Sequence, residues 1–434
     1  MRTIVQDYLD SVLAEISPHD DGEVAGYIPE LAKANPDSFG ICVATPDGHV
    51  YESGDTRVPF AIQSISKPFT YGLAITDLGF DAVSTKIDVE PSGEPFNEVS
   101  LDPVTKLPRN AMINAGAIAA ASLVRGADRD ERFARIQQCY SACAGRPLEL
   151  DNSIYRSESE TGHRNRAVGH LLRSFGVLDG DPEEALDVYL KQCSVIVECR
   201  DLAIMAATLA NGGTNPITGV QALPPAAVQQ VLSVMTTCGM YDNAGDWVTT
   251  VGLPAKSGVG GGILAVLPGQ LSVAVFSPRL DQHGNSVRGD LACRRLSKDM
   301  ELHFLNVTRG ARSAVRAQYD VTEREGAPRI RIFELHGDLH FAGAESVVRA
   351  ISEHAHEFDG LVLEVSKVDQ VGGVARSMLL QLQAALREDG KSAVIVDPDG
   401  ELPPAPLGPR RAKVFTDLDS AVAWCTARLE KPDQ

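Results

Sequence analysis

The chain has 434 residues, of which 44% are hydrophobic and 23% are charged, and its formal net charge is −18. This length predicts two domains, because one hydrophobic core rarely extends beyond about 300 residues. The negative charge argues against unspecific binding to nucleic acid or to an anionic membrane surface.

The first 16 residues predict a helix rather than a signal peptide. Their apolar side chains recur at helical spacing and alternate with Asp7, Asp10 and Glu15, whereas a signal peptide needs an unbroken apolar stretch. No segment of the sequence approaches the length of a membrane span. The eight cysteines are scattered along a chain large enough to fold without disulfides. We therefore expect reduced thiols in a cytoplasmic protein.

The rest of the first 307 residues predicts strands at both ends with helices between them. Residues 40–54 have the pattern of two short strands around a Pro-Asp-Gly turn, and 64–78 read as a helix. Residues 252–278 predict strands joined by Gly-rich turns, followed by a helix over 290–305. The helices expected between these parts cover 111–124, 130–144, 165–175, 182–193 and 200–209. This order indicates one α+β unit whose sheet combines distant segments.

The remaining residues predict a smaller α/β domain after a polar connection. Residues 308–328 carry several arginines, end in Gly-Ala-Pro and are interpreted as a linker, while 401–409 are Pro-rich and predict a loop. Strands are expected in IRIFEL, LVLEVS and SAVIVD, and helices over 344–356, 374–388 and 418–429. The predicted division is therefore a first domain over 1–307, a linker over 308–328 and a second domain over 329–434, of ordinary domain size.

Ser64 and Lys67 form an S-x-x-K pair at the start of the helix predicted over 64–78. A serine hydroxyl is a poor nucleophile until a base takes its proton, and lysine serves as that base only when it is neutral. Spacing of three on a helix places both side chains on one face. Pro68 is tolerated only near a helix start, so Ser64 lies where the helix dipole favours an oxyanion and disfavours a charged lysine.

The pair alone is a weak signal, because about one or two S-x-x-K matches arise by chance in a chain of this length. An isolated match is more often an N-cap serine followed by a solvated lysine. A second element, Lys256-Ser257-Gly258, lies in the late strand region and precedes a Gly-rich turn. S-x-x-K early on a helix with K-[ST]-G late on a strand is the order found in serine β-lactamases and penicillin-binding proteins. A tight hairpin without a ligand is the alternative reading of the second element.

The wider sequence context resembles the bacterial-type serine-dependent glutaminase family, which implies a β-lactamase-like fold for residues 1–307. The resemblance rests on nine stretches that occur in the family order. They are GYIPELA, AIQSISKPF, VEPSGEPFN, MINAGAI, SESETGHRN, YLKQCSV, LANGGTNP, TTCGMYD and PAKSGVGGGI.

This resemblance implies a role for each matching residue. The nucleophile would be Ser64, the base Lys67, and Tyr241 would help to move the proton. The backbone amides of Ser64 and Val259 would form the oxyanion hole. The residues implied in holding the substrate are Tyr27, Gln63, Ser64, Asn114, Glu158, Asn165, Tyr189, Tyr241 and Val259.

The residue types fit L-glutamine as substrate. A carboxylate such as Glu158 can pair with the substrate ammonium, and amide and phenol groups can donate to its carboxylate. Ser64 would attack the side-chain carbonyl, ammonia would leave, and water would hydrolyse the ester, with no cofactor or metal required. Without the resemblance, Glu158 would be read as a surface acid, Asn114 as a helix cap and Tyr189 as a core residue.

Two positions depart from the family pattern. Ala111 follows Asn110 where the family usually has proline, and His163 stands where it often has aspartate. Loss of the proline predicts a looser loop before Asn114 but removes no functional group, and a modest effect is expected from His163.

Residues 330–429 resemble a STAS domain, mainly through strand–helix order and FELHGDLHF and GLVLEVSKVDQVGG. Many STAS domains are phosphorylated on a serine in one turn, but the aligned turn here, residues 370–374, has no hydroxyl group. A binding partner and a purely structural role in assembly both stay open. The resemblance of residues 1–307 to the glutaminase family also implies a homo-oligomer, either a dimer or a tetramer.

Two alternatives to a glutaminase remain at this point. One is another serine acyl hydrolase of the same fold, acting on β-lactams or peptides, against which Glu158 and its neighbours argue. The other is a catalytically silent regulator that binds a ligand in one domain and a partner in the other. Intact Ser64, Lys67 and Tyr241 argue against the silent regulator.

Overall fold

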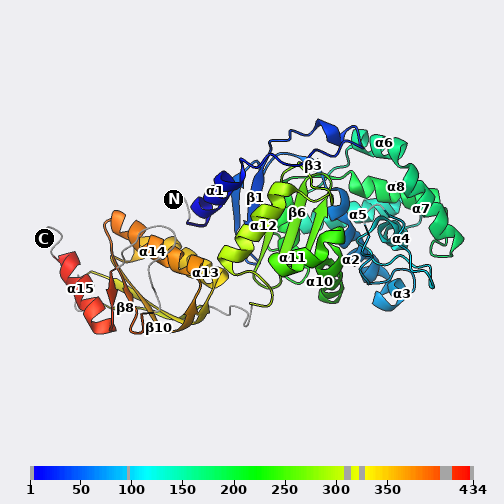
Figure 1. The fold of residues 1–434 in the computed structure, drawn as a ribbon. Coiled ribbons are helices and arrows are strands. Elements are labelled where there is room, and N and C mark those ends of the chain that lie inside the picture. The colour runs from blue at the N-terminus through cyan, green and yellow to red at the C-terminus, as the bar shows by residue number, and fades with distance from the viewer. Residues whose placement is uncertain (1–3, 95–97, 307–313, 322–327, 401–412, 431–434) are drawn as a thin grey trace. The chain divides into compact units, whose positions relative to one another are not determined.

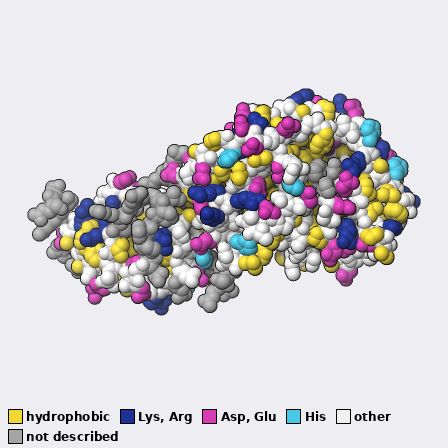
Figure 2. All heavy atoms as spheres, viewed as in Figure 1, with side chains coloured by type: hydrophobic (Ala, Val, Ile, Leu, Met, Phe, Trp, Pro, Cys, Tyr) yellow, Lys and Arg dark blue, Asp and Glu magenta, His cyan; other side chains and the backbone are white. Residues whose placement is uncertain are grey.

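The computed structural model describes residues 4–94, 98–306, 314–321, 328–400 and 413–430 (Figure 1). Its contacts divide the chain into two compact units, one of Tyr8–Arg295 and one of Met1–Asp7 together with Leu296–Gln434. No helix in the described ranges combines the length and the apolar character that a membrane crossing requires. On the face drawn in Figure 2, Lys and Arg side chains are scattered among acidic ones and form no broad basic surface.

The larger unit is built on an antiparallel sheet whose five strands come from both ends of that unit. The strand order is β2-β1-β7-β6-β5. The bounds are β1 Gly40–Ala44, β2 Val50–Gly54, β5 Ala255–Gly258, β6 Gly262–Leu267 and β7 Leu271–Phe276. Val43 of β1 lies opposite Tyr51 of β2 on one side and Val273 of β7 on the other. Both the hairpin predicted over 40–54 and the sheet of distant segments are thus confirmed.

Helices cover this sheet, whose inner strands are buried along their whole length. Helix α9 (Cys199–Ala210) packs against β1, β6 and β7. Helix α12 (Val287–Met300) contacts β6, since the position of a Cβ on Gly289 lies 3.0 Å from Ile263 Cδ1. The helix predicted over 290–305 is shorter at its C-terminal end. Glu301 has a φ of 56°, in the left-handed region that ends a right-handed helix.

The helical part of the larger unit is arranged around α2 (Ser66–Leu78), which is buried from Ser66 to Ile75. A helix buried on all sides is expected at the centre of a large core. Its neighbours are α4 (Asn114–Leu123), α5 (Arg129–Ala144) and α10 (Pro225–Cys238). The other helices of this unit are α3 Phe80–Ser84, α6 Asn152–Thr161, α7 His163–Ser174, α8 Pro182–Cys193 and α11 Ala244–Thr250. All five helices predicted between the strands are confirmed, and α1 (Ile4–Ile16) forms as predicted.

The smaller unit alternates strands and helices as predicted. Its sheet has the order β12-β11-β10-β9-β8, with β8 antiparallel to β9 and the remaining pairs parallel. The strand bounds are β8 Val315–Val321, β9 Ile330–Leu339, β10 Gly360–Val371, β11 Ser392–Val396 and β12 Val414–Phe415. The helices are α13 Phe341–Glu353, α14 Gly373–Glu388 and α15 Leu418–Glu430. Ala421 and Cys425 of α15 are buried against the apolar side chains of β9, β10 and β11.

The linker predicted over 308–328 differs from what the structure shows. Part of it lies outside the described residues, but Val315–Val321 form strand β8 and pair with β9. The apolar side chains of Val315, Ala317, Tyr319 and Val321 recur with the period of two that a strand requires. The arginine and other polar residues between them hid this pattern in the sequence. The loop predicted over 401–409 lies outside the described residues.

Candidate active site

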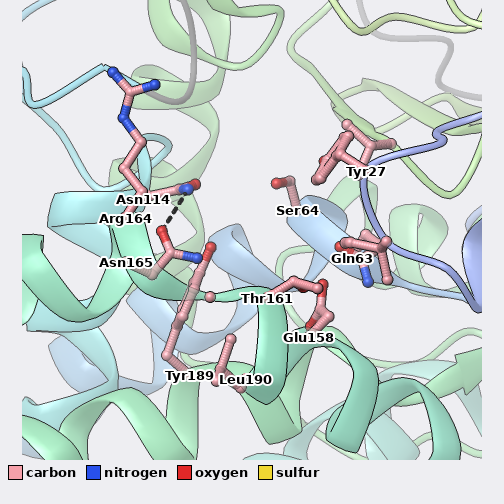
Figure 3. A pocket seen from close by; sticks show the side chains of 13 residues that line it. Tyr27, Gln63, Ser64, Asn114, Glu158, Thr161, Arg164, Asn165, Tyr189 and Leu190 are labelled. Atoms are coloured by element: carbon pink, nitrogen blue, oxygen red, sulfur yellow. Dashed lines mark hydrogen bonds between the residues drawn. The ribbon is translucent and has the colours of Figure 1, made fainter.

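Ser64 lies in a turn of 3-10 helix, η2 (Gln63–Ile65), that runs directly into α2. The helix predicted over 64–78 therefore has a tighter first turn. Gln63 has a φ of 50°, a left-handed conformation that is strained for a residue with a side chain. Pro68 is the third residue of α2, where its missing N–H has no intrahelical acceptor to lose. This backbone presents the Ser64 hydroxyl to an open space (Figure 3).

Lys67 is in the first turn of α2, and only 1% of it is exposed. Its Nζ donates a hydrogen bond of 2.7 Å to Asn114 Oδ1, and Asn114 Nδ2 donates one of 2.9 Å to Asn165 Oδ1. Burial lowers the pKa of the Lys67 ammonium to about 8, with Glu158 acting in the opposite direction. A substantial fraction of this amine is therefore neutral slightly above neutral pH, as a general base requires.

Tyr241 begins a second 3-10 turn, η3 (Tyr241–Asn243), and also has a positive φ, 58°. Its hydroxyl donates to the Ser257 carbonyl oxygen at 3.1 Å. Burial raises the pKa of the phenol to about 12, while hydrogen bonding to Ser64 and Ser257 opposes the rise. The fold thus brings Tyr241 next to Ser64, although 177 positions (241 minus 64) separate them in the sequence.

A cavity of about 280 Å³ opens in front of Ser64. This is near the lower limit of ligand pockets, which suits a small metabolite. Eight of the nine residues predicted to hold the substrate line it, and the ninth, Tyr241, is hydrogen-bonded to Ser64. The lining residues are Tyr27, Ile28, Gln63, Ser64, Asn114, Glu158, Thr161, Gly162, Arg164, Asn165, Tyr189, Leu190 and Val259. Ile28, Thr161, Gly162, Arg164 and Leu190 were not predicted from the sequence.

Glu158 supplies a buried carboxyl group to this cavity. It lies on α6, whose N-terminus is capped by the Asp151 side chain, and it is 7% exposed. Ser194 Oγ donates to Glu158 Oε2 at 3.4 Å. Burial raises the pKa of Glu158 to about 7, although hydrogen bonds from Gln63 and Ser194 and the Lys67 charge oppose the rise. A buried carboxyl group whose pKa stays raised despite these contacts can bind a cation, whose arrival would favour the ionised form.

Gln63 and Tyr27 border the same cavity in different ways. Gln63 Nε2 is buried and makes no hydrogen bond of good geometry among the described residues, but the Gln63 amide lies beside Glu158 and lowers the pKa of that carboxyl. Tyr27 is 56% exposed and lies on the same side of the view as Ser64 in Figure 3, and the Ser64 hydroxyl points away from it. Asn114 and Asn165 lie on the opposite side, joined by their hydrogen bond.

The loop before Asn114 is held by Asn110. Asn110 Oδ1 accepts from the Met112 amide at 2.9 Å, and its Nδ2 donates to Glu90 O at 2.8 Å. The loop also packs directly on α4, because a Cβ on Gly116 would lie 1.9 Å from Asn110 O. These contacts fix the position that the absent proline would otherwise have stiffened.

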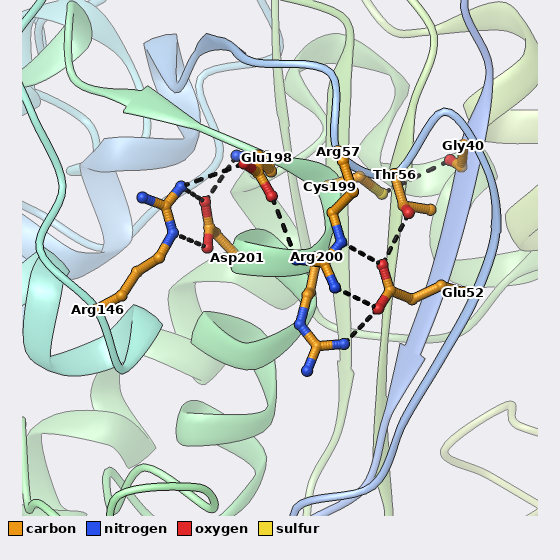
Figure 4. Close-up of polar contacts among 9 residues, drawn as sticks. All are labelled: Gly40, Glu52, Thr56, Arg57, Arg146, Glu198, Cys199, Arg200 and Asp201. Atoms are coloured by element: carbon orange, nitrogen blue, oxygen red, sulfur yellow. Dashed lines mark hydrogen bonds and ion pairs between the residues drawn. The ribbon is translucent and has the colours of Figure 1, made fainter.

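An ion-pair network supports the segments that lead to the cavity (Figure 4). Glu52 on β2 accepts from Thr56 Oγ1 at 2.8 Å, from Arg57 Nε at 2.9 Å and from Arg200 at a short distance. The network flanks a two-stranded ribbon, β3 (Phe60–Ala61) paired with β4 (Ile196–Val197). Because only Ile62 separates β3 from the Ser64 turn and only Val195 separates Ser194 from β4, the network helps to place both sides of the site.

Lys256 is a buried side chain to which the sequence analysis gave no role. Strand β5 carries it, and its Nζ lies 3.9 Å from the centroid of the Tyr241 ring. The K-[ST]-G triplet was the available signal, but it indicated only a strand beside a Gly-rich turn. The contact with Tyr241 depends on tertiary structure.

Comparisons with known proteins agree with this geometry. The family model described as Glutaminase matches residues 22–305, and the model described as STAS domain matches residues 321–403. Glutaminase 2 of Bradyrhizobium diazoefficiens is 42% identical over 444 residues, covering 98% of this chain and 71% of the relative. The glutaminase of Corynebacterium glutamicum is 43% identical over 401 residues, covering 92% and 95%.

A solved structure is similar over the same extent. Mglu in its native form superposes with a TM-score of 0.70 at 44% sequence identity, covering 92% of this chain and all (100%) of that one. The likeness therefore includes both the part that holds the cavity and much of the smaller unit.

Proposed function

The chain belongs to the glutaminase family and carries a STAS domain after its β-lactamase-like domain, and from this we propose that Ser64 is the nucleophile with which it hydrolyses L-glutamine. One observation carries the proposal. A single small cavity joins the Ser64 hydroxyl to the buried Glu158 carboxyl, so one molecule can meet a nucleophile at one end and a counter-ion for its ammonium at the other.

The proposed reaction begins when neutral Lys67 accepts the Ser64 proton. Ser64 Oγ then bonds to the side-chain carbonyl carbon of glutamine, and the oxyanion is held by the backbone amides of Ser64 and Val259. Tyr241 passes a proton to the leaving nitrogen as the carbon–nitrogen bond breaks, and the Lys67 ammonium returns a proton to Tyr241. Ammonia leaves. Neutral Lys67 then takes a proton from the water that attacks the γ-glutamyl ester, and this proton passes to Ser64 Oγ as glutamate is released. The low pKa of Lys67 and the hydrogen bonding between Tyr241 and Ser64 support these assignments.

Glutamine is proposed to bind with its ammonium at Glu158. Its carboxylate would meet the donors Asn165, Tyr189 and Gln63, while Tyr27 closes the mouth of the cavity and Asn114 orients Lys67. Directed polar contacts of this kind discriminate strongly, because an analogue without the amino-acid head leaves buried polar groups unpaired. The side chains of Gln63, Asn165 and Tyr189, which line the same cavity as Glu158, support this arrangement.

The domain boundaries and the role of the smaller domain also stay proposals. We place the glutaminase domain in residues 1–307 and the STAS domain in residues 329–434, now with β8 added to its sheet. A protein or small-molecule partner is proposed for the STAS domain. A cytoplasmic location is supported by all eight cysteines being buried free thiols. A homo-oligomer, to be measured by light scattering, is proposed from the resemblance.

The decisive experiment compares wild type with Ser64→Ala for ammonia release from L-glutamine and L-asparagine and for ring opening of a β-lactam. Wild type is expected to prefer glutamine, and Ser64→Ala is expected to lose at least about a thousandfold in kcat, as removal of a serine nucleophile does elsewhere. Ser84→Ala is the matched control, because Ser84 is a half-buried serine on α3 that does not line the cavity. Ammonia release that persists in Ser64→Ala would exclude the serine mechanism.

A further inference from the structure

Lys256 of the glutaminase domain is fully buried, although it carries an amine that is normally charged. It lies on β5 opposite Leu264 of β6, and 0% of it is exposed. Its Nζ donates a hydrogen bond of 2.7 Å to Ser257 O. No carboxylate pairs with it among the described residues. A lysine buried without a counter-ion is costly, so its contacts must offset that cost.

All these contacts lead to Tyr241. The amine lies 3.9 Å from the centroid of the Tyr241 ring, and the Tyr241 hydroxyl donates to Ser257 O, the carbonyl that also accepts from Lys256. The backbone brings the two together. A Cβ on Gly239 would lie 1.7 Å from Ala255 O, so only glycine lets the turn before Tyr241 approach β5 this closely.

Charge adds a second link, to Lys67. Burial lowers the pKa of Lys256 well below its ordinary value, and the Lys67 charge lowers it further. A neutral amine still carries N–H donors, so the hydrogen bond to Ser257 O does not depend on protonation. The site can therefore contain two lysines without holding two buried positive charges.

We propose that Lys256 is a positioning residue for the glutaminase reaction, which holds the Tyr241 ring and the Ser257 carbonyl so that the phenol stays beside Ser64. A carbonyl oxygen has two lone pairs, and with Lys256 at one of them the Tyr241 hydroxyl is directed to the other. The ring contact then fixes the rotation of the phenol. This inference rests on the proposed function, because it takes Tyr241 to be the group that carries the proton to the leaving nitrogen.

A double-mutant cycle of Lys256→Met and Tyr241→Phe tests the proposal. Methionine keeps the length and apolar volume of lysine but removes the N–H donors. In the wild-type background the substitution is expected to lower kcat about tenfold, the effect of one lost hydrogen bond on a barrier, with KM changed less than about twofold. In the Tyr241→Phe background the same substitution is expected to change kcat less than about twofold, because its target is already absent.

Lys391→Met is the matched control. Lys391 Nζ donates to Phe358 O at 2.7 Å and lies 5.4 Å from the Phe358 ring centroid, which reproduces both contacts of Lys256 in the other unit. Its kcat is expected to equal that of wild type. If Lys256→Met does not fold, the cycle is repeated with Lys256→Gln, which keeps a polar end in the buried position, and the same non-additivity is expected.

The outcomes separate this inference from the function on which it rests. An unchanged kcat in Lys256→Met, or an equal loss with and without Tyr241→Phe, overturns the positioning role while leaving Tyr241 as the proton carrier. Full activity in Tyr241→Phe overturns the proposed role of Tyr241 itself. A rise in KM without a fall in kcat would also overturn the proposal, because it would assign Lys256 to substrate binding.

Discussion

Replacing Glu158 with glutamine is expected to make the unliganded protein more stable and almost inactive. The free-energy cost follows from the pKa of this carboxyl, about 7 in the folded chain against 4.5 as its ordinary value. The difference of about 2.5 pKa units corresponds to about 3 kcal/mol of unfolding free energy at 1.36 kcal/mol per unit. Glu158 is buried, so solvent screening does not reduce this figure much.

The sign of the effect depends on pH. The folded state binds the Glu158 proton more tightly than the unfolded state, so wild-type stability falls as pH rises from 4.5 to 7, whereas glutamine does not titrate. Glu158→Gln should therefore melt about 6 °C above wild type at pH 8, and the two should melt closer together near pH 5. Calorimetry of both proteins at both pH values measures this.

Activity and a control complete the test. Without the carboxylate, kcat/KM for glutamine is expected to fall at least about a hundredfold, since a buried charged partner of the substrate ammonium is lost. Glu160→Gln, an exposed glutamate on the same helix, should change neither the melting temperature nor the rate. A melting difference that is the same at pH 5 and pH 8, or a Glu158→Gln protein less stable at pH 8, would refute the reasoning.

The remaining predictions concern pH and the ion-pair network. Ionised Glu158 and neutral Lys67 are the productive forms, so kcat/KM should rise with pH through about 7 and about 8 and then level off. Initial rates between about pH 5.5 and 9.5 measure this profile, and a rate that falls over that range contradicts it. Glu52→Gln removes the carboxylate that Thr56, Arg57 and Arg200 share. It should lower the melting temperature by about 2–4 °C, as loss of about 1 kcal/mol does in a domain of this size, and an unchanged calorimetric transition would assign the network no stabilising role.

The sequence predicted the elements with a strong local signal. The Pro46–Gly48 turn fixed the first hairpin, and the buried helix after Ser64 followed from its apolar run. Helix α6 was not predicted, because its sequence is mostly polar and Glu158 is its one buried residue. The early end of α12 depends on the left-handed backbone of Glu301, and a glutamate at this position does not predict that conformation.

The candidate site divides in a similar way. The nine residues proposed to hold the substrate could be named from their motifs; eight of them line one cavity, and Tyr241 is hydrogen-bonded to Ser64. Neither the pKa values nor the role of Lys256 could be predicted, because both depend on how distant segments approach each other. The close approach of Gly239 to Ala255 O helps to decide where Tyr241 lies. It joins the end of a helix to a strand, and no sequence pattern relates these two segments.

The sheet of the larger unit has a consequence for biosynthesis. Strand β1 can pair with β2 early, but its other partner β7 ends only at Phe276, so Gly40 waits for more than 200 residues (276 minus 40) before it can pair with Phe276. Until then one edge of β1 has no partner, and contacts of such high sequence separation form slowly. A ribosome-bound chain that already displays Ser64 and Lys67 thus has neither Tyr241 nor β5 against them. Nascent glutaminase should consequently be inactive and dependent on chaperones until the smaller domain is being translated.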